Sequence, residues 1–453
     1  MLYTLFFNFL LFLTLVVSIA VGHDERTVFH KRQLRSVTDI PGEGRLVFVH
    51  ALWRHGDRMP DIGLPADKNV WPWPIGELTI NGMKDQFLLG EKLRKRYIEA
   101  EKSLNPRFDT SEIFIRSSDK NRTLVSASST MLGMYSKNAV KGEDYPDVPG
   151  WPSNYVAVPI HTQEYSTDYV ANVNRKCPRL RELLNYIYNT CPEGVKTQEE
   201  NKDLFKRLTE LAGTKISIQN LWMVHDYAMV CRTYNKTFEG MNETLFHRIE
   251  VLDDYIDHLQ FGIGVPPHNG LNIQLEMARL RGGPMITDMI NRMEMKMKCD
   301  KMKENDDKGD KECQQMKKLK FYGYSAHDMT ISALFSVFGF PSPNYQSKNL
   351  PRYSTAVTLE LREINREYVI RLLFWPPIDD TYQDITPEIQ NCGPICTYGT
   401  FRHLAENFMV EDAQKMCETP LFYHSNDNKT VKGGSYVLIN IVLLVFLALL
   451  ALY

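Results

Sequence analysis

Three short apolar runs along the chain are each followed by a helix-like stretch. The first run covers residues 45–53 (R-L-V-F-V-H-A-L-W), and shorter runs cover residues 112–115 and 320–324. Nearly continuous apolar runs are typical of strands that are buried on both faces of a sheet. The alternation predicts an α/β fold, with an open, mostly parallel sheet flanked by helices. Apolar residues at helical spacing follow the runs over residues 78–97, 123–134 and 330–338.

A different pattern appears near the C-terminal end of the predicted sheet. Residues 355–362 and 367–375 alternate between apolar and polar side chains around the polar residues 363–366. Alternation on both sides of a short polar turn predicts a β-hairpin, which we place at a sheet edge.

The middle of the chain is mostly helical in pattern. Residues 161–315 show helical periodicity and weak strand signals, so we expect a smaller helical subdomain inserted into the α/β domain. The α/β domain would then consist of residues 44–160 and 316–425. Residues 294–320 are dense in Lys, Asp, Glu and Met, which predicts an exposed charged loop.

Both ends of the chain are apolar. Residues 1–22 resemble a secretory signal peptide with small residues, Ala20 and Gly22, at the expected cleavage site; an uncleaved N-terminal anchor is the alternative. Residues 436–453 carry one polar side chain, Asn440, and are just long enough to cross a bilayer. This segment fits either a single-pass anchor or a GPI signal. In both cases we expect the folded body outside the cytosol, at the cell surface or in a lumen.

Composition supports a folded, exported protein. Charged residues make up 24% of the 453 residues and the net charge is −2, which disfavours disorder and gives no indication of nucleic-acid binding. The eight cysteines lack the C-x-x-C spacing of a zinc site, so we expect disulfides. Glycosylation sequons lie at Asn121, Asn235, Asn242 and Asn428.

Charged and titratable residues follow each of the three predicted strands. Arg54-His55-Gly56-Asp57-Arg58-Met59-Pro60 follows the first, Arg116-Ser117-Ser118-Asp119 ends the second, and His327-Asp328 follows the third. Ligands of open α/β sheets bind at the carboxyl ends of the strands, so these groups should meet at one edge. The pooled set contains three arginines, two histidines and a carboxylic acid. Arginine matches phosphate oxygens in pairs, and the sequence therefore predicts a cationic phosphate site.

The residue types suggest a reaction without a metal or cofactor. The sequence contains neither an H-E-x-x-H zinc motif nor a P-loop. A neutral imidazole at His55 can attack phosphorus, and Asp328 can protonate the leaving alcohol. Nearby arginines would keep His55 neutral in acid, and Asp328 must be protonated, so we expect an acidic pH optimum. His50, inside the first strand, is expected to be structural.

These motifs resemble those of the histidine acid phosphatases, the branch of the phosphoglycerate-mutase-like superfamily that includes prostatic and lysosomal acid phosphatases. The family's R-H-G-x-R-x-P motif is present as residues 54–60, its second arginine motif as residues 116–124, and its H-D pair as His327-Asp328. The resemblance runs from about residue 44 to residue 420. It implies hydrolysis of phosphate monoesters, with His55 as the phosphorylated nucleophile and Asp328 as the proton donor. The phosphate clamp implied by the resemblance is Arg54, Arg58, Arg116 and His327.

The resemblance also implies a possible homodimer and a set of disulfides. The pairs Cys392–Cys396 and Cys177–Cys417 follow the family, and we assign the remaining cysteines as Cys191–Cys231 and Cys299–Cys313. Two alternatives stay open. One is an inositol-polyphosphate phosphatase (phytase) of the same fold, and the other is a catalytically silent surface protein that binds ligands.

Overall fold

A computed structural model describes residues 43–302, 310–346, 349–377, 379 and 381–421. The strands are β1 (Arg45–Arg54), β2 (Ile113–Ser118), β3 (His161–Gln163), β4 (Phe321–Ala326), β5 (Ala356–Ile364), β6 (Glu367–Trp375), β7 (Gln383–Asp384) and β8 (Cys396–Thr397). The α-helices are α2 (Ile80–Arg94), α3 (Asn121–Tyr135), α4 (Pro178–Asn189), α5 (Pro192–Glu200), α6 (Lys202–Ala212), α7 (Leu221–Thr233), α8 (Glu243–Gln260), α9 (Ile273–Arg281), α10 (Gly283–Lys301), α11 (Lys311–Lys318), α12 (Asp328–Val337), α13 (Tyr398–Glu406) and α14 (Ala413–Glu418). A π-helix (Lys95–Ala100) extends α2, and a 3₁₀ turn covers Thr386–Glu388.

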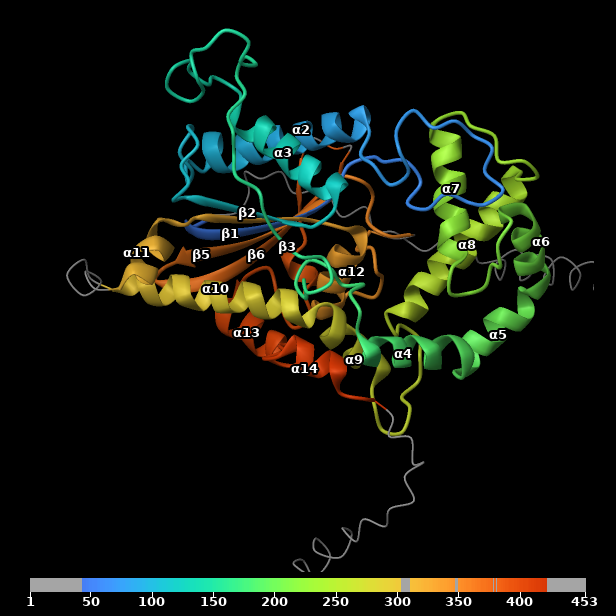
Figure 1. The fold of residues 1–453 in the computed structure, drawn as a ribbon. Helices are drawn as coiled ribbons and strands as arrows, with labels where there is room; N and C mark the ends of the chain where they lie inside the picture. Colours follow the sequence, from blue (N-terminus) through green and yellow to red (C-terminus); the bar gives the residue numbers. More distant parts are fainter. Residues whose placement is uncertain (1–42, 303–309, 347–348, 378, 380, 422–453) are drawn as a thin grey trace, which may run out of the picture. The chain divides into compact units, whose positions relative to one another are not determined.

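The strands form one sheet in the order β3-β2-β4-β1-β5-β6-β7, and β8 also pairs with β6. The four strands from β3 to β1 are mutually parallel, whereas β5, β6 and β7 pair antiparallel. The predicted fold class, an α/β sheet flanked by helices, is confirmed (Figure 1).

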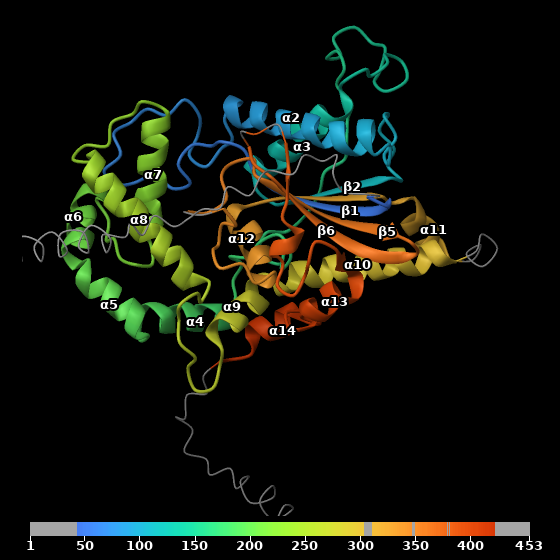
Figure 2. The ribbon, with the colours of Figure 1, turned by 180° about the vertical axis from the view of Figure 1, so that it is seen from behind.

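Helices cover both faces of this sheet. Alternate residues of β1 point to opposite faces. Phe48 and Leu52 belong to the apolar cluster formed with α10, α12 and α13. Val49 and Trp53 belong to the cluster formed with α2 and α3. Figure 2 shows the two helix layers from behind, with α2 and α3 on one side of the strands and α10 and α13 on the other. Burial on both faces is the reason that the first strand reads as a continuous apolar run.

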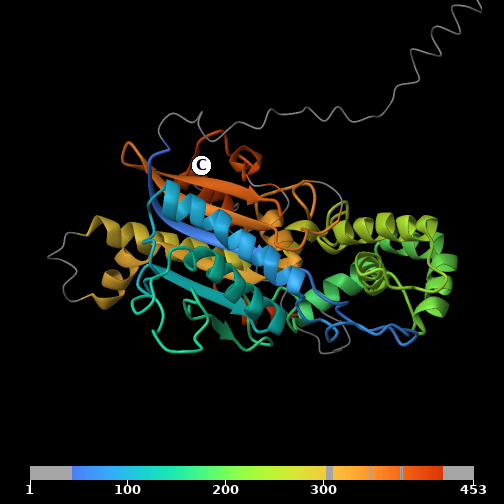
Figure 3. The same ribbon diagram turned by 90° about the horizontal axis from the view of Figure 1, so that it is seen from above.

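Helices α4, α6, α7, α8 and α9 contribute to a separate apolar cluster that includes Leu183, Leu208, Val224 and Ile249. Seen from above, α4 to α8 gather beside the sheet (Figure 3). Helix α10 falls inside the range 161–315 that we expected to form a helical subdomain, but its apolar side chains pack on the sheet. Its burial against strands that are distant in sequence could not be read from helical periodicity alone.

Two local predictions need correction. Within the expected loop of residues 294–320, the described residues form the end of α10 and all of α11, which the Cys299–Cys313 disulfide joins, while residues 303–309 lie outside the described part of the chain. Within this stretch the Lys296 ammonium is buried and donates to three backbone carbonyls. The predicted hairpin is present as β5 and β6, with positive φ angles at Asn365 and Arg366, but it does not form the sheet edge. Strands β7 and β8 pair with β6 outside it.

The disulfides differ from expectation at one pair. The structure joins Cys177 to Cys417, Cys299 to Cys313 and Cys392 to Cys396. Cys191 and Cys231, which we expected to pair, are instead buried free thiols. Each thiol has another neighbour, since Cys191 Sγ lies 2.7 Å from Glu193 Oε2 and Cys231 lies beside Tyr227.

The surface and the ends of the chain bear on the export predictions. The expected sequon asparagines Asn121, Asn235 and Asn242 are exposed, and Asn428 lies outside the described residues. The expected signal peptide (1–22) and C-terminal anchor (436–453) also lie outside them. In the part of the chain that the structure describes, no helix has the length and apolar character that crossing a membrane requires.

A buried charge network lies at the end of the sheet opposite the carboxyl ends of the parallel strands. The Glu360 carboxylate is fully buried and accepts hydrogen bonds from Arg96 and Arg362, with distances of 2.7 to 2.9 Å. Burial raises the pKa of Glu360, but the two arginines outweigh it and lower the pKa to about 2. A carboxyl whose pKa is lower in the folded than in the unfolded state stabilises the fold above its unfolded pKa.

Replacing Glu360 with glutamine is expected to lower the free energy of unfolding by about 2–4 kcal/mol at neutral pH, because Arg96 and Arg362 lose their fully buried counter-charge and keep only the more exposed Glu101 and Glu43. The loss should shrink as the pH falls from 4.5 towards 2, where the wild-type carboxyl also becomes protonated. Urea unfolding at several pH values measures both effects. Glu363→Gln, on the same strand but paired at the surface with Arg45, is the control. Equal losses of unfolding free energy in the Glu360 and Glu363 variants would contradict this role of Glu360.

Candidate active site

The carboxyl ends of the three predicted strands meet in the structure. Strand register places Arg54 of β1 opposite Ala326 of β4, and the His55 amide donates to the Ala326 carbonyl at 3.0 Å. Ser118 ends β2, the next parallel strand, and its Oγ lies 2.9 Å from His327 Nε2. The first two residues after β4 begin α12, with His327 as the N-cap. The sheet therefore brings groups from distant parts of the sequence to one edge, as the strand pattern predicted.

Gly56 sets the close approach of α2 to this edge. A Cβ atom on Gly56 would lie 2.3 Å from the carbonyl oxygen of Gly82, and a Cβ on Gly82 would lie 2.2 Å from the Asp57 carbonyl. Thr79 caps α2 by accepting from the Gly82 amide, and it donates to the Asp57 carboxylate. The sequence suggested that Gly56 gives room to a ligand; in the structure it gives room to the backbone of α2.

His55 is the most deeply buried titratable group of the cluster, with 2% of its surface exposed. Its Nδ1 lies 2.8 Å from the carbonyl oxygen of Gly56. Because a carbonyl can only accept, Nδ1 carries the hydrogen and Nε2 retains a lone pair. Burial, followed by the positive charges of Arg122 and Arg54, holds the pKa of His55 well below 6.5. The imidazole is therefore neutral well into the acid range, and its Nε2 carries a lone pair.

His327 and Asp328 lie beside His55. The His55 and His327 rings meet edge to face with centroids 5.5 Å apart. Burial and Arg122 lower the pKa of His327 to about 3. Burial raises the pKa of Asp328, but Arg54, 2.7 Å from its carboxylate, outweighs this and the pKa is lowered. In the free protein Asp328 is thus an ion-paired carboxylate.

Arg54 is held by the segment that precedes β5, a feature the sequence analysis missed. Its guanidinium lies 4.2 Å above the ring of Tyr353 and donates to the Pro351 carbonyl at 2.7 Å. The Ser354 amide donates to the His55 carbonyl at 3.2 Å. One short segment therefore fixes both Arg54 and His55. No local motif marked Tyr353, because nearly 300 residues separate it from Arg54 in the sequence.

Two more arginines lie in carboxylate pairs at the same edge. Arg58 binds Asp226 of α7 through both nitrogens of its fork, with distances of 3.0 and 2.9 Å. Arg122, in the first turn of α3, lies 2.9 Å from Asp61. Both arginines lower the pKa of His55 and of His327. We expected an unpaired cationic site from the sequence, but here each arginine is already paired with a carboxylate.

Arg116, which we predicted as part of the phosphate clamp, does not join this cluster. Its Nη2 binds Asp168 at 2.6 Å and Gln163 at 3.0 Å, whereas Arg122 is among the main causes of the lowered pKa values of His55 and His327. Arg116 lies within β2, where it is directed to the loop after β3. Arg122 occupies the expected position instead, because the turn into α3 brings the first helical turn back over the strand ends.

Replacing Arg122 with alanine is expected to lower kcat/KM by about 10²- to 10³-fold, as removal of one preorganised donor to a transferring group does. Arg116→Gln should stay within about tenfold of wild type and instead lower the thermal unfolding midpoint, since it leaves the buried Asp168 without its cation. Steady-state hydrolysis of phenyl phosphate and thermal unfolding separate the two effects. A larger kinetic loss for the Arg116 variant would restore the sequence-based assignment.

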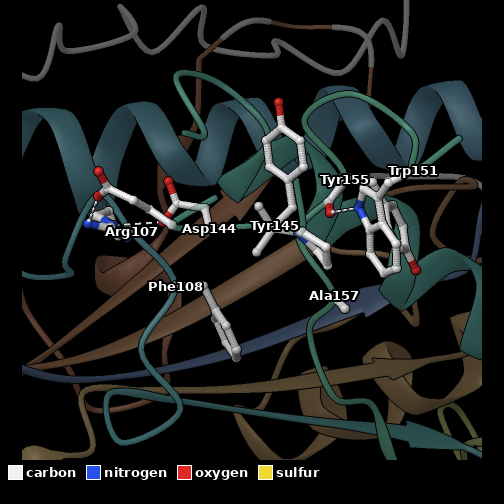
Figure 4. A pocket seen from close by; sticks show the side chains of 10 residues that line it. Arg107, Phe108, Asp144, Tyr145, Trp151, Tyr155 and Ala157 are labelled. Carbon is white, nitrogen blue, oxygen red and sulfur yellow. Dashed lines mark hydrogen bonds and ion pairs between the residues drawn. The ribbon is translucent and has the colours of Figure 1, made fainter. Parts of the chain in front are cut away.

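A surface cavity of about 340 Å³ lies elsewhere, between the loop of residues 143–157 and the segment at Arg107 and Phe108 (Figure 4). Arg107 is paired with Glu143 and Asp144 on one side of it. The cavity contains none of the groups at the strand ends. We therefore place the active site at the strand ends and not at this cavity.

The chain belongs to the histidine phosphatase superfamily (branch 2), whose family model matches residues 45–375. Within the superfamily it groups with the acid phosphatases. It is 28% identical over 396 residues to putative acid phosphatase 10 of Caenorhabditis elegans, which covers 83% of this chain and 94% of the relative. It is 26% identical over 393 residues to human prostatic acid phosphatase, covering 85% and 91%. Lysosomal acid phosphatase of Xenopus laevis is 25% identical over 407 residues, covering 86% and 82%.

Solved structures support the fold. The phytase of Hafnia alvei in its apo form superposes with a TM-score of 0.56 at 12% identity, covering 84% of this chain and all of the other. The Citrobacter braakii phytase gives a TM-score of 0.55 at 12% identity, covering 83% of this chain and all of the other. At this identity the likeness concerns the fold alone.

Proposed function

We propose that the protein hydrolyses phosphate monoesters through a phosphohistidine on His55, with Asp328 as the proton donor. The observation that carries the proposal is the neutral, Nδ1-protonated imidazole of His55 surrounded by Arg54, Arg58 and Arg122. These three arginines would exchange their present carboxylate partners for the phosphate oxygens of the substrate. His327 would also bind the phosphate oxygens.

In the first step, His55 Nε2 would form a bond to phosphorus while the bond between phosphorus and the ester oxygen breaks. The leaving oxygen takes the proton of Asp328 and departs as the alcohol. The Gly56 carbonyl keeps its hydrogen bond from Nδ1 as positive charge develops on the ring. Arginine side chains compensate the negative charge on the equatorial oxygens.

In the second step, water would attack the phosphohistidine. The Asp328 carboxylate, now deprotonated, takes a proton from that water, and the bond between Nε2 and phosphorus breaks. Inorganic phosphate leaves, and the imidazole returns to its neutral form. Asp328 serves as acid in the first step and as base in the second, so no other titrating group is required.

The proton that Asp328 donates has to be supplied, because Arg54 holds this carboxyl ionised in the free protein. A phosphate monoester has a second pKa of about 6, so below that pH it enters as a monoanion with one proton. We propose that this proton passes to Asp328 when the phosphate displaces the carboxylate from Arg54. The acid optimum would then follow the substrate's ionisation.

The pH dependence of kcat/KM tests this proposal. It should fall tenfold per pH unit above about pH 6, where the substrate loses its proton. His55 should not impose a limit on the acid side near 6.5, since its pKa is well below that value. For a phosphate ester with a lower second pKa, the falling limb of the kcat/KM profile should shift to lower pH by the same number of pH units. A limb that stays fixed when the substrate is changed would contradict delivery by the substrate, and absence of phosphate release would contradict the proposed activity.

Three disulfides fit a body that folds in an oxidising compartment. We therefore propose that the catalytic body is lumenal or extracellular. The anchor proposed from residues 436–453 would tether it to a membrane. Release of the body by a phosphatidylinositol-specific phospholipase C would distinguish a GPI anchor from a membrane-spanning one.

A further inference from the structure

Two carboxylates at the active site, Asp61 and Asp226, have no part in the reaction proposed above. Asp61 follows the R-H-G-D-R-M-P segment and Asp226 lies on α7, in the helical part of the chain. The Asp61 amide donates to Asp226 Oδ2 at 2.8 Å, so the two residues support each other. Each carboxylate pairs with an arginine that acts on His55, namely Arg122 and Arg58.

The charges in this cluster cancel. Arg54 pairs with Asp328, as the other two arginines pair with Asp226 and Asp61. His55 and His327 are neutral, because their pKa values are far below 6.5. A bound phosphate therefore brings the centre to a net negative charge. Any further anion on the substrate would lie near this negative centre.

Burial fixes the direction in which a substrate extends. His55 is 2% exposed, whereas the side chains of Asp226 and Asp61 are 17% and 26% exposed. The phosphate must reach the buried imidazole, so its leaving group extends towards the more exposed groups of the cluster, which include these two carboxylates. Lys120 is a further cation near this rim, where its ammonium lies 4.3 Å from the centre of the Tyr165 ring. The leaving group thus meets two carboxylates on its way to solvent.

We propose that Asp61 and Asp226 are specificity-determining residues that select phosphate monoesters whose leaving group is uncharged or carries a cation, and that they reject leaving groups with a further phosphate or carboxylate. This inference rests on the proposed function of the site. Electrostatic selection works both by attraction of the right partner and by repulsion of the wrong one. Because the rim is only partly exposed, the repulsion is screened less than between charges in bulk water.

Three phenyl phosphates of nearly the same shape measure this selection: phenyl phosphate, 4-carboxyphenyl phosphate and 4-(aminomethyl)phenyl phosphate. At about pH 5.5 the carboxyl and amine are both charged. Wild type should hydrolyse the amine at least about fivefold more efficiently than the carboxylate, compared as kcat/KM. Asp226→Asn and Asp61→Asn should each reduce this ratio by about threefold or more, with the change residing mainly in KM. Differences in leaving-group reactivity cancel when each variant is compared with wild type.

Asp147→Asn is the matched control, because Asp147 is an exposed aspartate paired with Lys141 in a loop away from the strand ends. It should leave the ratio unchanged. Raising the salt concentration should reduce the wild-type ratio of kcat/KM for the amine to kcat/KM for the carboxylate. This provides a second test that needs no variant.

Variants that remain active on phenyl phosphate with an unchanged ratio would overturn the inference, as would a wild-type ratio that is insensitive to salt. Absence of activity on phenyl phosphate in wild type would instead overturn the proposed function. The two failures are therefore distinguishable.

Discussion

His55→Ala is expected to lower kcat by at least about 10⁴-fold, because it removes the imidazole that we propose forms the covalent intermediate, whereas the Nε2 of the neighbouring His327 is engaged by Ser118 Oγ. His55 is positioned by its own backbone, through the amide bonded to the Ala326 carbonyl, and the Gly56 carbonyl fixes its tautomer. Loss of the ring removes the nucleophile and leaves the arginines in place. The binding of inorganic phosphate as a competitive inhibitor should therefore persist within about tenfold of wild type.

The matched control for this variant is His247→Ala. His247 lies on the exposed face of α8, where it pairs with Glu250. The same chemical change there should leave kcat within about twofold of wild type. Thermal unfolding of both variants checks that the fold is intact. A folded His55→Ala protein with more than about a tenth of wild-type activity would show that His55 is not the nucleophile.

Asp328→Asn is expected to lower kcat by about 10³-fold for an alkyl phosphate and by less than about tenfold for 2,4-dinitrophenyl phosphate, provided that breaking the ester bond is rate-limiting. An alkoxide is a poor leaving group and needs the proton of Asp328, whereas dinitrophenolate leaves without one. Asparagine preserves the shape of the side chain, its position at the start of α12 and a hydrogen-bond acceptor towards Arg54.

This dependence on the leaving group separates proton donation from phosphate positioning. If Asp328 only oriented Arg54, both substrates would lose activity equally. Pre-steady-state release of the alcohol isolates the first step from hydrolysis of the intermediate. Asp147→Asn again serves as the control for a neutralised aspartate, and it should affect neither substrate.

The sequence predicted those site residues that come directly after a buried strand. Arg54 ends β1 and His55 follows it, and His327 and Asp328 follow β4, so the strand pattern alone places them at one edge of the sheet. Arg116 was predicted in the phosphate clamp because it lies in the predicted strand; the structure pairs it with Asp168, and Arg122 reaches the strand ends through the turn into α3. The periodicity of a strand does not show that the first turn of the following helix lies over the strand ends.

Partners that come from distant segments could not be predicted. Asp226 lies on an amphipathic helix and resembles any solvent-facing acid, yet it binds Arg58, which is 168 residues away. Tyr353 precedes β5 and stacks on Arg54. Their roles depend on tertiary packing that leaves no local signature. The sequence suggested a cationic site because the carboxylate partners of the arginines could not be recognised from it. In the structure these arginines are already paired with carboxylates.

The fold itself was more predictable than its edges. Continuous apolar runs identified β1, β2 and β4, because these strands are covered by helices on both faces. Short strands such as β3, with three exposed residues, have no apolar pattern to detect. Helix α10 has helical periodicity like its neighbours, and only its contacts show that it covers the sheet.

The most direct test of the central claim is to locate the phosphoryl group during turnover. Asp328→Asn protein mixed with phosphate-labelled 2,4-dinitrophenyl phosphate should accumulate the intermediate, because the base for its hydrolysis is missing. After denaturation in alkali and digestion, the account predicts one labelled peptide, phosphorylated at His55, with the label stable in base and lost in mild acid, and no label in the His55→Ala protein. A burst of dinitrophenol without covalent label, or label on another residue, would contradict the account.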